Sequence, residues 1–462
     1  MKITRKIKRK LKKMMGKEKK STPAKDRKYQ ILLLTNRDSD NVGDQVIEAT
    51  DISLVKAAMK NLGISGDDVN VDSRAASIVT QNYLRKKDPA LLANADNIIS
   101  KSSVVLFGGA PVFNYLYQNF YERTAVTIEL AEKHGKPVLF SAVGVDGYDE
   151  DNERCQRIVD KINSDAVVQV TTRDNIDALG KYMRNPKIPY CKVADPAVFS
   201  ERVFEPYLSE KKKKPTVGLF IFRAHGFTDN NIPFTAEDSV EMWLGLKKEL
   251  ESRGYAVEFL TSGHFGDEAF MDLMIREYGV SADDCVFNIN CPEDLIGRIS
   301  SYKGVVSCRL HPSIISFALG VPALGIVWNS KVEGFYRGAG YEDRLVYTDN
   351  MTVTSLADRL EAAMSEPVNR DKEFMMSVYN TLFEGLKKSL RLDTDAKPYT
   401  YDELIEALRP YGGTSEKAQK AKLQRKFRRI YELLNRRDVR IHELKKELAE
   451  LKENQINEDN QQ

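Results

Sequence analysis

Arg309 and His311 are the two residues in this sequence whose types and spacing are best suited to chemistry. A permanent cation and an ionisable imidazole stand two positions apart, directly after the apolar run 305–307, and Pro312 suits the first turn of a helix. The N-terminus of such a helix offers unpaired backbone N–H groups to an anion. We therefore predict a site that binds an anion and moves a proton. A histidine packed in the core is the alternative interpretation.

Asn41, Gly43 and Asp44 form a second cluster of this kind. They follow the apolar run 31–35 and open a helical pattern. Glycine has no Cβ, so it permits a sharp turn or the close approach of a ligand, and the helix that follows offers N–H groups to an anion. The pattern predicts a loop that binds an anion. An ordinary helix N-cap would have the same residue types.

Five more residues at the ends of strand-like runs are candidates for binding: Gly108, Gly109, Arg173, Arg223 and Lys331. An arginine can hold a carboxylate or a phosphate through two parallel N–H bonds, which a lysine cannot do. The two glycines would let the backbone approach a ligand closely. Tight turns, ion pairs with neighbouring carboxylates and plain solvent exposure are the alternatives at these positions.

Apolar runs alternate with helical patterns along the body of the chain. The first series predicts strands at 31–35, 104–107, 138–143 and 167–172, with helices from about Asp44, from about Val112, past Glu150 and from Asp174. The second series predicts strands at 217–222, 257–260, 305–306 and 323–327, with helices over 236–252, near 267–277 and from His311. Such alternation is typical of βαβ units in a parallel sheet.

This pattern predicts an α/β fold with two Rossmann-like, doubly wound domains that face each other across a cleft, the arrangement called GT-B. We place the N-terminal domain at 29–205 and the C-terminal domain at 216–370, joined by an exposed basic connection at 206–215. A helical stretch within 371–410 is expected to pack back across the domains. The candidate residues all follow strands, so they are expected to form one site at the cleft.

Both ends of the chain differ from its body. The arm at 1–28 holds 14 Lys or Arg residues and two acidic residues, a net charge of about +12, whereas the whole chain carries only +3. The spacing of Ile3, Ile7, Leu11 and Met14 places one apolar face on a cationic helix, which predicts that residues 1–15 lie on an anionic membrane surface. A solvated tail is the alternative. The arm has no aromatic residue to stack on bases, so no specific nucleic-acid binding is expected.

Residues 415–455 have the spacing of a coiled coil. Apolar residues and one cation alternate in steps of four and three at 423, 427, 430, 434, 437, 441, 444, 448 and 451, with charged residues between them. The pattern predicts a homo-oligomer joined through this helix. A single amphipathic helix that lies on the body is the alternative.

The remaining composition excludes several classes of protein. The five cysteines have no CxxC pair and the five histidines have no metal-ligand grouping, so a zinc site is not expected and the thiols are expected to be reduced. No apolar core follows the basic arm, which argues against a signal peptide, and no run reaches the length of a membrane span. A cytoplasmic body, peripheral on the inner face of the cell membrane, is the expected location.

The ordered set of motifs resembles the polysaccharide pyruvyl transferase family over roughly residues 30 to 345. The resemblance rests on Asn41-x-Gly-Asp44, Gly108-Gly109, Arg173-Asp174, Asp195-Pro-Ala197, Arg309-Leu-His311, Gly320-x-Pro322 and Lys331. It implies a GT-B-like fold and transfer of a pyruvyl unit from phosphoenolpyruvate to a sugar, as a ketal. Arg309 and His311 match the family's donor-site motif, and Arg223 stands where a donor-contacting arginine is expected. Ala110 replaces a glycine that is frequent in the family.

Phosphoenolpyruvate carries a carboxylate and a phosphate, so its site needs several fixed cations, for which Arg309, Arg223 and Lys331 are the candidates. We expect His311 to protonate the methylene carbon, since the ordinary pKa of histidine is about 6.5. In the transfer reaction that the resemblance implies, Asp44 is expected to orient the acceptor or act as a base. No metal and no cofactor besides the co-substrate is expected. Two alternatives remain: a glycosyltransferase that uses a sugar nucleotide, and a non-catalytic scaffold of a polysaccharide-synthesis complex. No glutamate-rich donor motif follows His311, and the intact Arg309, His311 and Lys331 argue against a decayed core.

Overall fold

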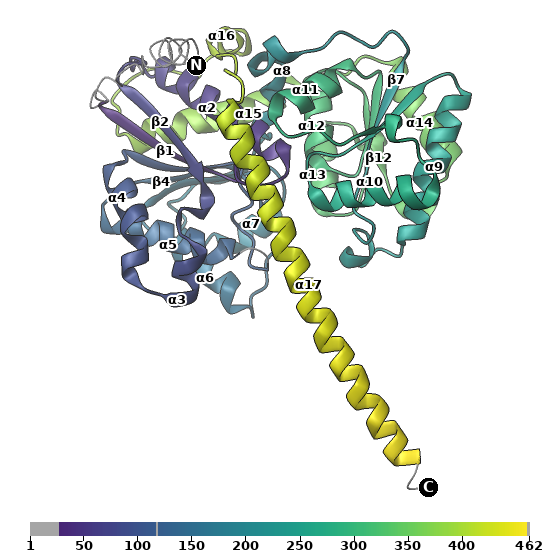
Figure 1. The fold of residues 1–462 in the computed structure, drawn as a ribbon. Coiled ribbons are helices and arrows are strands. Elements are labelled where there is room, and N and C mark those ends of the chain that lie inside the picture. Colours follow the sequence, from purple (N-terminus) through teal and green to yellow (C-terminus); the bar gives the residue numbers. More distant parts are fainter. Residues whose placement is uncertain (1–26, 117–118, 460–462) are drawn as a thin grey trace, which may run out of the picture.

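Two parallel β-sheets of six strands each form the frame of the molecule, one in each of the two lobes in Figure 1. The computed structural model describes residues 27–116 and 119–459, so the predicted arm lies almost entirely outside the described residues. Within the described part of the chain, no helix is long and apolar enough to cross a membrane. The predicted α/β architecture with two parallel sheets is confirmed.

The first lobe contains the sheet with strand order β2-β1-β3-β4-β5-β6. Its central strands consist almost wholly of buried residues, as expected for a parallel sheet covered by helices on both faces. The strands are β1 (Tyr29–Thr35), β2 (Val69–Ala75), β3 (Val104–Gly108), β4 (Val138–Val143), β5 (Val167–Thr172) and β6 (Tyr190–Lys192). The helices are α2 (Val42–Asn61), α3 (Gln81–Lys86), α4 (Ala93–Lys101), α5 (Phe120–Lys133), α6 (Glu153–Ile162), α7 (Ile176–Tyr182) and α8 (Ser200–Val203).

The second lobe contains the sheet with strand order β12-β11-β10-β7-β8-β9. The strands are β7 (Thr216–Phe220), β8 (Ala256–Leu260), β9 (Cys285–Val286), β10 (Gly304–Ser307), β11 (Ala323–Ile326) and β12 (Leu345–Val346). The helices are α9 (Ala236–Ser252), α10 (Phe265–Tyr278), α11 (Pro292–Ser301), α12 (Leu310–Ala318), α13 (Ser330–Gly338) and α14 (Val353–Ser365). Helix α9 has the bounds predicted for it, and a capping box between Thr235 and Asp238 explains where it begins.

The strand orders fix where a ligand site can form. In the first sheet, β1 lies between β2 and β3, so the chain winds outward in both directions from the gap between β1 and β3. In the second sheet, the same reversal falls between β7 and β10. Ligands of doubly wound folds bind outside the carboxyl ends of the strands at such reversals. The segments after these four strands carry most of the residues that the sequence selected, whereas Arg173 follows β5 and Lys331 follows β11.

Three further helices follow the second sheet: α15 (Lys372–Ser389), α16 (Tyr401–Ala407) and α17 (Glu416–Asp459). Helix α15 crosses back to the first lobe, where Ser377 accepts a hydrogen bond from the Ala194 N–H at 2.9 Å and Leu139 lies against Gly385. Its buried residues Tyr379 and Leu382 join an apolar core that is continuous with α2, α11 and α12. The two lobes therefore share one core at the base of the cleft.

The helix predicted from about Val112 is wrong in its start, because α5 begins at Phe120. Val112 and Phe113 are fully buried, and Phe113 pairs with Val145 in an isolated bridge beside the first sheet. Burial of these apolar side chains against the sheet edge outweighs the helical pattern. Strand β2 and helices α3 and α4 were not predicted, since β2 contains Asp72, Ser73 and Arg74 and has no apolar run.

Candidate active site

Asn41, the N-cap of α2, meets His311, in the first turn of α12, at the cleft between the lobes. The Asn41 side chain accepts a hydrogen bond from the Gly43 N–H at 3.2 Å, and its Nδ2 lies 2.9 Å from His311 Nδ1. A Cβ at Gly43 would overlap the imidazole. Glycine at this position therefore lets the N-terminus of α2 lie directly against His311. The structure brings these three predicted residues together.

This contact defines the state of His311. Because Asn41 Oδ1 accepts from Gly43, its amide NH₂ faces His311 Nδ1, which must then be the acceptor, so the imidazole proton resides on Nε2. His311 is 6% exposed, and its Nε2 is buried without a hydrogen-bond partner. Burial lowers the pKa of His311 well below its usual range, and the charges of Arg173, Lys331 and Arg309 lower it further. The unliganded protein therefore holds a neutral imidazole with a free Nε2–H donor.

Asp44 lies one turn into α2 and is 6% exposed. Burial raises its pKa to about 6, although hydrogen bonding to Ser39 and the charge of Arg173 act in the opposite direction. Asn36, in the loop after β1, donates a hydrogen bond from Nδ2 to Asp44 Oδ2 at 3.1 Å. A carboxyl group with this pKa can hold and release a proton near neutral pH. Asp44 therefore has the near-neutral pKa, suited to proton transfer, that the sequence analysis expected of His311.

Arg309 precedes α12 and is fixed by a bidentate ion pair with Asp267 of α10. Its Nε and Nη2 donate to the two Asp267 oxygens at 2.8 and 2.6 Å, and the Asp267 side chain is fully buried. The guanidinium group lies 4.5 Å from the centre of the Phe222 ring. Its Nη1 has no hydrogen bond with any residue of the described chain. Arg309 is therefore held rigidly with one N–H₂ group available for an anion.

Arg223 lies beside Arg309 but points elsewhere. Its backbone N–H donates to Asp267 Oδ1 at 3.1 Å, and its guanidinium group is 5.9 Å from the Phe222 ring centre. The side chain is 37% exposed and forms an ion pair with Asp229. The two arginines thus share Asp267 and Phe222, which places them at one site. In this conformation the Arg223 charge is directed toward solvent.

Lys331 and Arg173 each contribute a charge that is already paired. Lys331, at the start of α13, forms an ion pair with Asp146 of the first lobe and so connects the two sides of the cleft. Arg173, after β5, bonds Asp195 at 2.5 Å with both side chains at most 5% exposed. Each cation therefore keeps a carboxylate partner in the unliganded protein, and an anionic ligand would compete with those carboxylates or join them.

Gly108 and Gly109 make room for α2. A Cβ at Gly108 would overlap the Asp51 carboxylate, and a Cβ at Gly109, where φ is +55°, would overlap Ile47. Only glycine has no steric penalty at that φ. Asp51 is 2% exposed, its Oδ2 has no hydrogen-bond partner, and burial raises its pKa well above the usual range. The glycines thus border a second buried carboxyl group on α2, seven residues beyond Asp44.

Sequence reasoning did not select several residues that complete this arrangement. Asp267 and Asp146, the partners of Arg309 and Lys331, both lie within a few residues of a strand end, which was the available signal. Asn36 lies directly after β1 and could have been found in the same way. Within the described residues, no group of three or more His, Cys, Asp or Glu side chains is arranged to hold a metal ion.

The root of α17 lies across both lobes at this cleft (Figure 1). Lys422 donates to Gln45 of α2, Lys426 forms an ion pair with Glu268 of α10 at 2.6 Å, and Arg429 forms one with Asp40 at 2.9 Å. These cations repeat at intervals of four and three, so they share one helix face. The predicted apolar stripe is rotated by one residue, about 100° around the helix, from these cations. It is exposed, for example 56% at Leu434 and 51% at Ile441. The helix is confirmed, and its apolar face is not the one that contacts the body.

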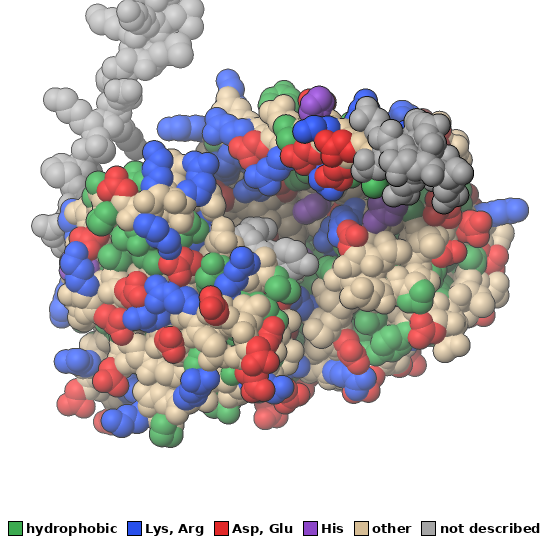
Figure 2. All heavy atoms as spheres, turned by 90° about the horizontal axis from the view of Figure 1, so that it is seen from below, with side chains coloured by type: hydrophobic (Ala, Val, Ile, Leu, Met, Phe, Trp, Pro, Cys, Tyr) green, Lys and Arg blue, Asp and Glu red, His purple; other side chains and the backbone are tan. Residues whose placement is uncertain are grey.

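The space-filling view from below shows the face from which α17 extends, hollowed between the two lobes (Figure 2). Histidine and basic side chains lie along the walls of this hollow. The position agrees with the residues described above, which come from both lobes.

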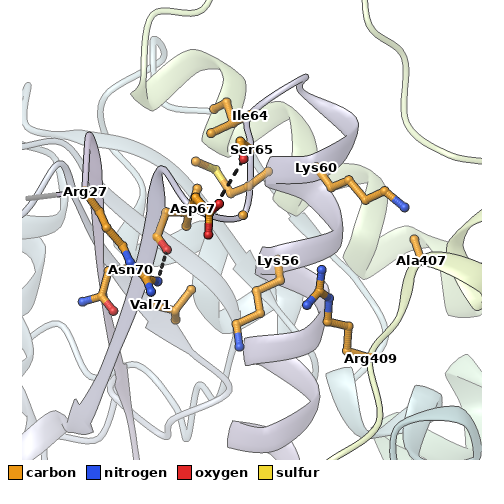
Figure 3. Close-up of a pocket in the computed structure, with 13 residues that line it drawn as sticks. Arg27, Lys56, Lys60, Ile64, Ser65, Asp67, Asn70, Val71, Ala407 and Arg409 are labelled. Atoms are coloured by element: carbon orange, nitrogen blue, oxygen red, sulfur yellow. Dashed lines mark hydrogen bonds between the residues drawn. The ribbon is translucent and has the colours of Figure 1, made fainter. Parts of the chain in front are cut away.

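A separate cavity of about 510 Å³ lies on the first lobe, beside the residues that follow the basic arm (Figure 3). Its walls carry Arg27, Lys56 and Lys60 of α2, and Arg409 from the segment after α16. None of these four side chains forms an ion pair with a carboxylate of the described chain. Burial lowers the pKa of Lys56, and the neighbouring charges of Arg409 and Arg27 lower it further. Asp67 also lines the cavity, so four basic side chains face one carboxylate and the cavity is cationic.

Comparisons with known proteins agree with this geometry. A family model described as polysaccharide pyruvyl transferase matches residues 41–330, which include Asn41, His311 and the elements between them. No curated protein sequence matches the chain. Among solved structures, a putative UDP-N-acetylglucosamine 2-epimerase from Listeria monocytogenes has a TM-score of 0.51 and 10% identity, over 80% of this chain and 99% of that one.

A second solved structure is the UDP-GlcNAc 2-epimerase from Methanocaldococcus jannaschii, with a TM-score of 0.49 and 13% identity, over 77% of this chain and 98% of that one. At such identities the likeness concerns the fold alone. The two-sheet, GT-B-like arrangement predicted from the sequence is thereby supported by the Listeria structure.

Proposed function

The chain belongs to the polysaccharide pyruvyl transferase family, and on this premise we propose that it transfers a pyruvyl group from phosphoenolpyruvate to a sugar. The acceptor is a sugar of a cell-surface polysaccharide or of a lipid-linked glycan precursor. The product is a ketal in which the pyruvate C2 carbon bridges two sugar hydroxyls. The family match supports the transferase class, and the site described above supports the choice of donor.

One observation carries the proposal: a buried, neutral His311 with a free Nε2–H group lies among three cations. Arg309, Lys331 and Arg173 all lower the pKa of His311, which places their positive charge around the imidazole. Phosphoenolpyruvate carries a carboxylate and a phosphate on a three-carbon frame. Such a compact polyanion would accept hydrogen bonds from the Nε2–H and from the free N–H₂ group of Arg309, and at Lys331 and Arg173 it would compete with or join the carboxylates of Asp146 and Asp195.

The transfer balances without a cofactor or a metal ion. A proton adds to the C3 methylene of phosphoenolpyruvate, which becomes a methyl group, and the electrophilic C2 accepts the first sugar hydroxyl. The bond from C2 to the phosphate oxygen then breaks, and the second hydroxyl attacks C2 to close the ketal. Two hydroxyl protons are released in total. One replaces the proton now held by the methyl group, and the other leaves with the phosphate.

The structure changes how we divide these steps between residues. Asp44, with its pKa near 6, is the group that can supply a proton to C3 and accept one from a hydroxyl. Burial and the nearby cations lower the pKa of His311 so far that the free enzyme holds it uncharged, so its first role is to donate the Nε2–H to the bound anion. A bound phosphate would raise the pKa of His311 again. Arg309, held by Asp267, fixes the position of the donor.

Isothermal calorimetry with phosphoenolpyruvate tests this proposal without knowledge of the acceptor. We expect the wild-type protein to bind phosphoenolpyruvate, and Arg309→Ala and His311→Ala to weaken the binding at least about tenfold, about 1.4 kcal/mol. Arg337→Ala is the matched control, because Arg337 is 51% exposed on α13 and pairs only with carboxylates of the surface. The same proteins are titrated with UDP, GDP and CMP.

The alternatives give different results in this experiment. Binding of a nucleotide without binding of phosphoenolpyruvate would indicate a glycosyltransferase. If none of the ligands binds, the result would favour a non-catalytic scaffold of a polysaccharide-synthesis complex. Equal binding of phosphoenolpyruvate by wild type and both active-site variants would contradict the assigned site.

We also propose that the protein works at an anionic membrane surface on the cytoplasmic side. The basic arm at 1–15 is the predicted anchor. The cationic cavity around Lys56 and Arg409 lies where the arm joins the folded body, so it would extend the basic surface that faces the headgroups (Figure 3). A lipid-linked acceptor would be concentrated at the same surface.

A further inference from the structure

A cavity of about 440 Å³ lies where the two lobes and α17 meet, next to the proposed active site. Its walls come from the first lobe, the second lobe and α17: they include Asn36 and Ser39 after β1, Arg123 of α5, His264 and Phe265 at the start of α10, and Arg429 of α17. Its volume falls within the range of about 300 to 1,000 Å³ that is usual for small-molecule sites. None of these six residues belongs to the motifs from which the donor site was predicted.

The cavity is connected to Asp44 by direct hydrogen bonds. Asn36, which lines the cavity, donates to Asp44 Oδ2 at 3.1 Å. The Ser39 side chain is also hydrogen-bonded to Asp44, which lowers the pKa of that carboxyl group against the effect of burial. A molecule in the cavity is therefore one residue away from the group that can accept a hydroxyl proton.

Arg123 indicates what kind of acceptor fits. Its Nε is buried without a hydrogen-bond partner, and its only side-chain hydrogen bond within the described chain is from Nη2 to Gln81 Oε1 at 3.1 Å. No carboxylate of the described residues forms an ion pair with it. A half-buried guanidinium group without a counter-ion is costly, and an anionic ligand would offset that cost. Phosphate matches the planar N–H fork of arginine.

The other walls suit a sugar ring. His264 and Phe265 are stacked with ring centres 5.3 Å apart at an angle of 12°, which gives a flat apolar surface. The opposite side offers an amide and a hydroxyl from Asn36 and Ser39. Arg429 is held by Asp40 at 2.9 Å and by the Asp38 carbonyl oxygen at 2.6 Å, so this wall is fixed. Asp38 and Asp40 also line the cavity, but their carboxylates are paired with Arg425 and Arg429, whereas Arg123 has no such partner among the described residues. Few, well-placed polar groups beside an aromatic surface are usual in ligand sites.

We propose that this cavity is the acceptor subsite, and that the acceptor is a sugar with a phosphate on its anomeric oxygen, not a neutral polysaccharide chain. Arg123 binds the phosphate, the ring lies against Phe265, and two hydroxyls are directed toward Asn36 and Asp44. The inference rests on the proposed pyruvyl transfer and deepens it, since it selects carrier-linked precursors over the finished polymer. It also gives α17 a part in the site through Arg429.

Saturation-transfer NMR and calorimetry on the full-length protein test this with defined probes. The 1-phosphates of glucose, galactose, mannose and N-acetylglucosamine are compared with the corresponding methyl glycosides and with inorganic phosphate. At least one 1-phosphate is expected to bind about tenfold more tightly than its methyl glycoside and than inorganic phosphate. Arg123→Gln is expected to abolish that preference, and Arg85→Gln on the neighbouring exposed helix to preserve it.

A second variant guards against loss of folding in Arg123→Gln. Ser77→Phe adds a ring to the cavity wall, so it should weaken the binding of 1-phosphates and of methyl glycosides to the same extent. The inference is overturned if no sugar probe binds, or if 1-phosphates bind no more tightly than their methyl glycosides. It is also overturned if inorganic phosphate binds as tightly as the sugar phosphates, or if Arg123→Gln still prefers the 1-phosphates.

Titration of the same proteins with phosphoenolpyruvate separates this inference from the proposed function. If Arg123→Gln binds phosphoenolpyruvate like wild type, the two subsites are distinct, as proposed. If Arg123→Gln loses phosphoenolpyruvate binding, the cavity belongs to the donor and only the acceptor inference fails. If wild type binds sugar phosphates but not phosphoenolpyruvate, the proposed function fails while the cavity is still a sugar-phosphate site.

Discussion

Asn41 Nδ2 lies 2.9 Å from His311 Nδ1 across the cleft, although 270 residues separate the two in the chain. The contact joins the first helix of one domain to the helix after β10 in the other, and it determines which nitrogen of the imidazole carries the proton. The geometry of the site thus depends on how the two domains are held together. The same dependence makes the contact a sensitive point for experiment.

Replacement of Asn41 by Asp should reverse the state of His311. Aspartate preserves the N-cap of α2, but its carboxylate next to Nδ1 would favour a proton there and raise the pKa of His311 by about 1 to 3 units. Histidine-labelled NMR of the five histidines, with His311→Gln for assignment, measures both the tautomer and the pKa. We expect phosphoenolpyruvate to bind about tenfold more weakly, because a negative charge is added beside the donor site.

Asn41→Ser is the matched control, since serine is also a good N-cap but cannot reach the imidazole with a charge. An unchanged tautomer and pKa in Asn41→Asp would show that the contact does not define the state of His311.

Asp44→Asn should make the protein more stable at neutral pH. The pKa of Asp44 is raised from 3.8 to about 6 in the folded state, so the folded protein holds this proton more tightly than the unfolded chain. The associated stability is complete below the unfolded pKa and is lost as the pH rises through the folded pKa. At pH 8 the ionised carboxylate costs about 3 kcal/mol, which asparagine would remove.

Urea unfolding of wild type and Asp44→Asn at pH 4 and pH 8 measures this effect. The difference in the free energy of unfolding between the two proteins should be larger at pH 8 by an amount on the order of 3 kcal/mol. The variant should also lose transferase activity. A stability difference that does not change with pH would mean that Asp44 does not titrate near 6.

The exposed stripe of α17 should hold two or more copies of the chain together. Ile441 and Leu448 lie on the stripe and are 51% and 53% exposed. Ile441→Glu with Leu448→Glu would place charges at the centre of a coiled coil, where they are strongly unfavourable. Sedimentation velocity should therefore detect an oligomer for wild type and a monomer for the double variant.

Lys446→Glu is the control for this prediction, because residue 446 lies on the outer face of the heptad. It should leave the sedimentation coefficient unchanged. A wild-type protein that sediments as a monomer at micromolar concentration would rule out association through α17.

Membrane association should depend on both the arm and the cationic cavity. Flotation with vesicles that contain anionic lipid should carry the wild-type protein, whereas neutral vesicles should not. Lys56→Glu with Lys60→Glu should weaken binding about tenfold or more, since each basic residue near such a surface contributes about 1 kcal/mol. The protein without residues 1–15 should bind most weakly.

Lys248→Glu, the same kind of substitution at one exposed lysine of α9 in the other lobe, should have no effect on flotation. Equal recovery with anionic and neutral vesicles, or no recovery with either, would contradict the membrane proposal.

The local patterns in the chain were sufficient for most of the strands and several of the helices, and for their order. Apolar runs of four to seven residues followed by amphipathic helices predict parallel sheets, because the periods of burial on strands and helices are set by the backbone itself. The motifs at Asn41, Gly43, Asp44, Arg309 and His311 could be found for the same reason, since each directly follows a strand. The start of α5 could not be found, because packing of Val112 and Phe113 against the sheet outweighed the helical pattern, and strand β2 could not, because it has polar residues in place of an apolar run.

The sequence by itself determined which residues reach the cleft, but only the tertiary structure decided what each can do there. His311 has an ordinary pKa in an isolated peptide. In the fold, burial and three cations keep it neutral, while burial brings Asp44 to a pKa of about 6. A sequence fixes the type of an ionisable group, whereas its pKa depends on water and charges within a few ångströms, which distant segments supply. The same holds for Arg123 and Arg429, which only the packing of α5 and α17 around the cleft brings to one cavity.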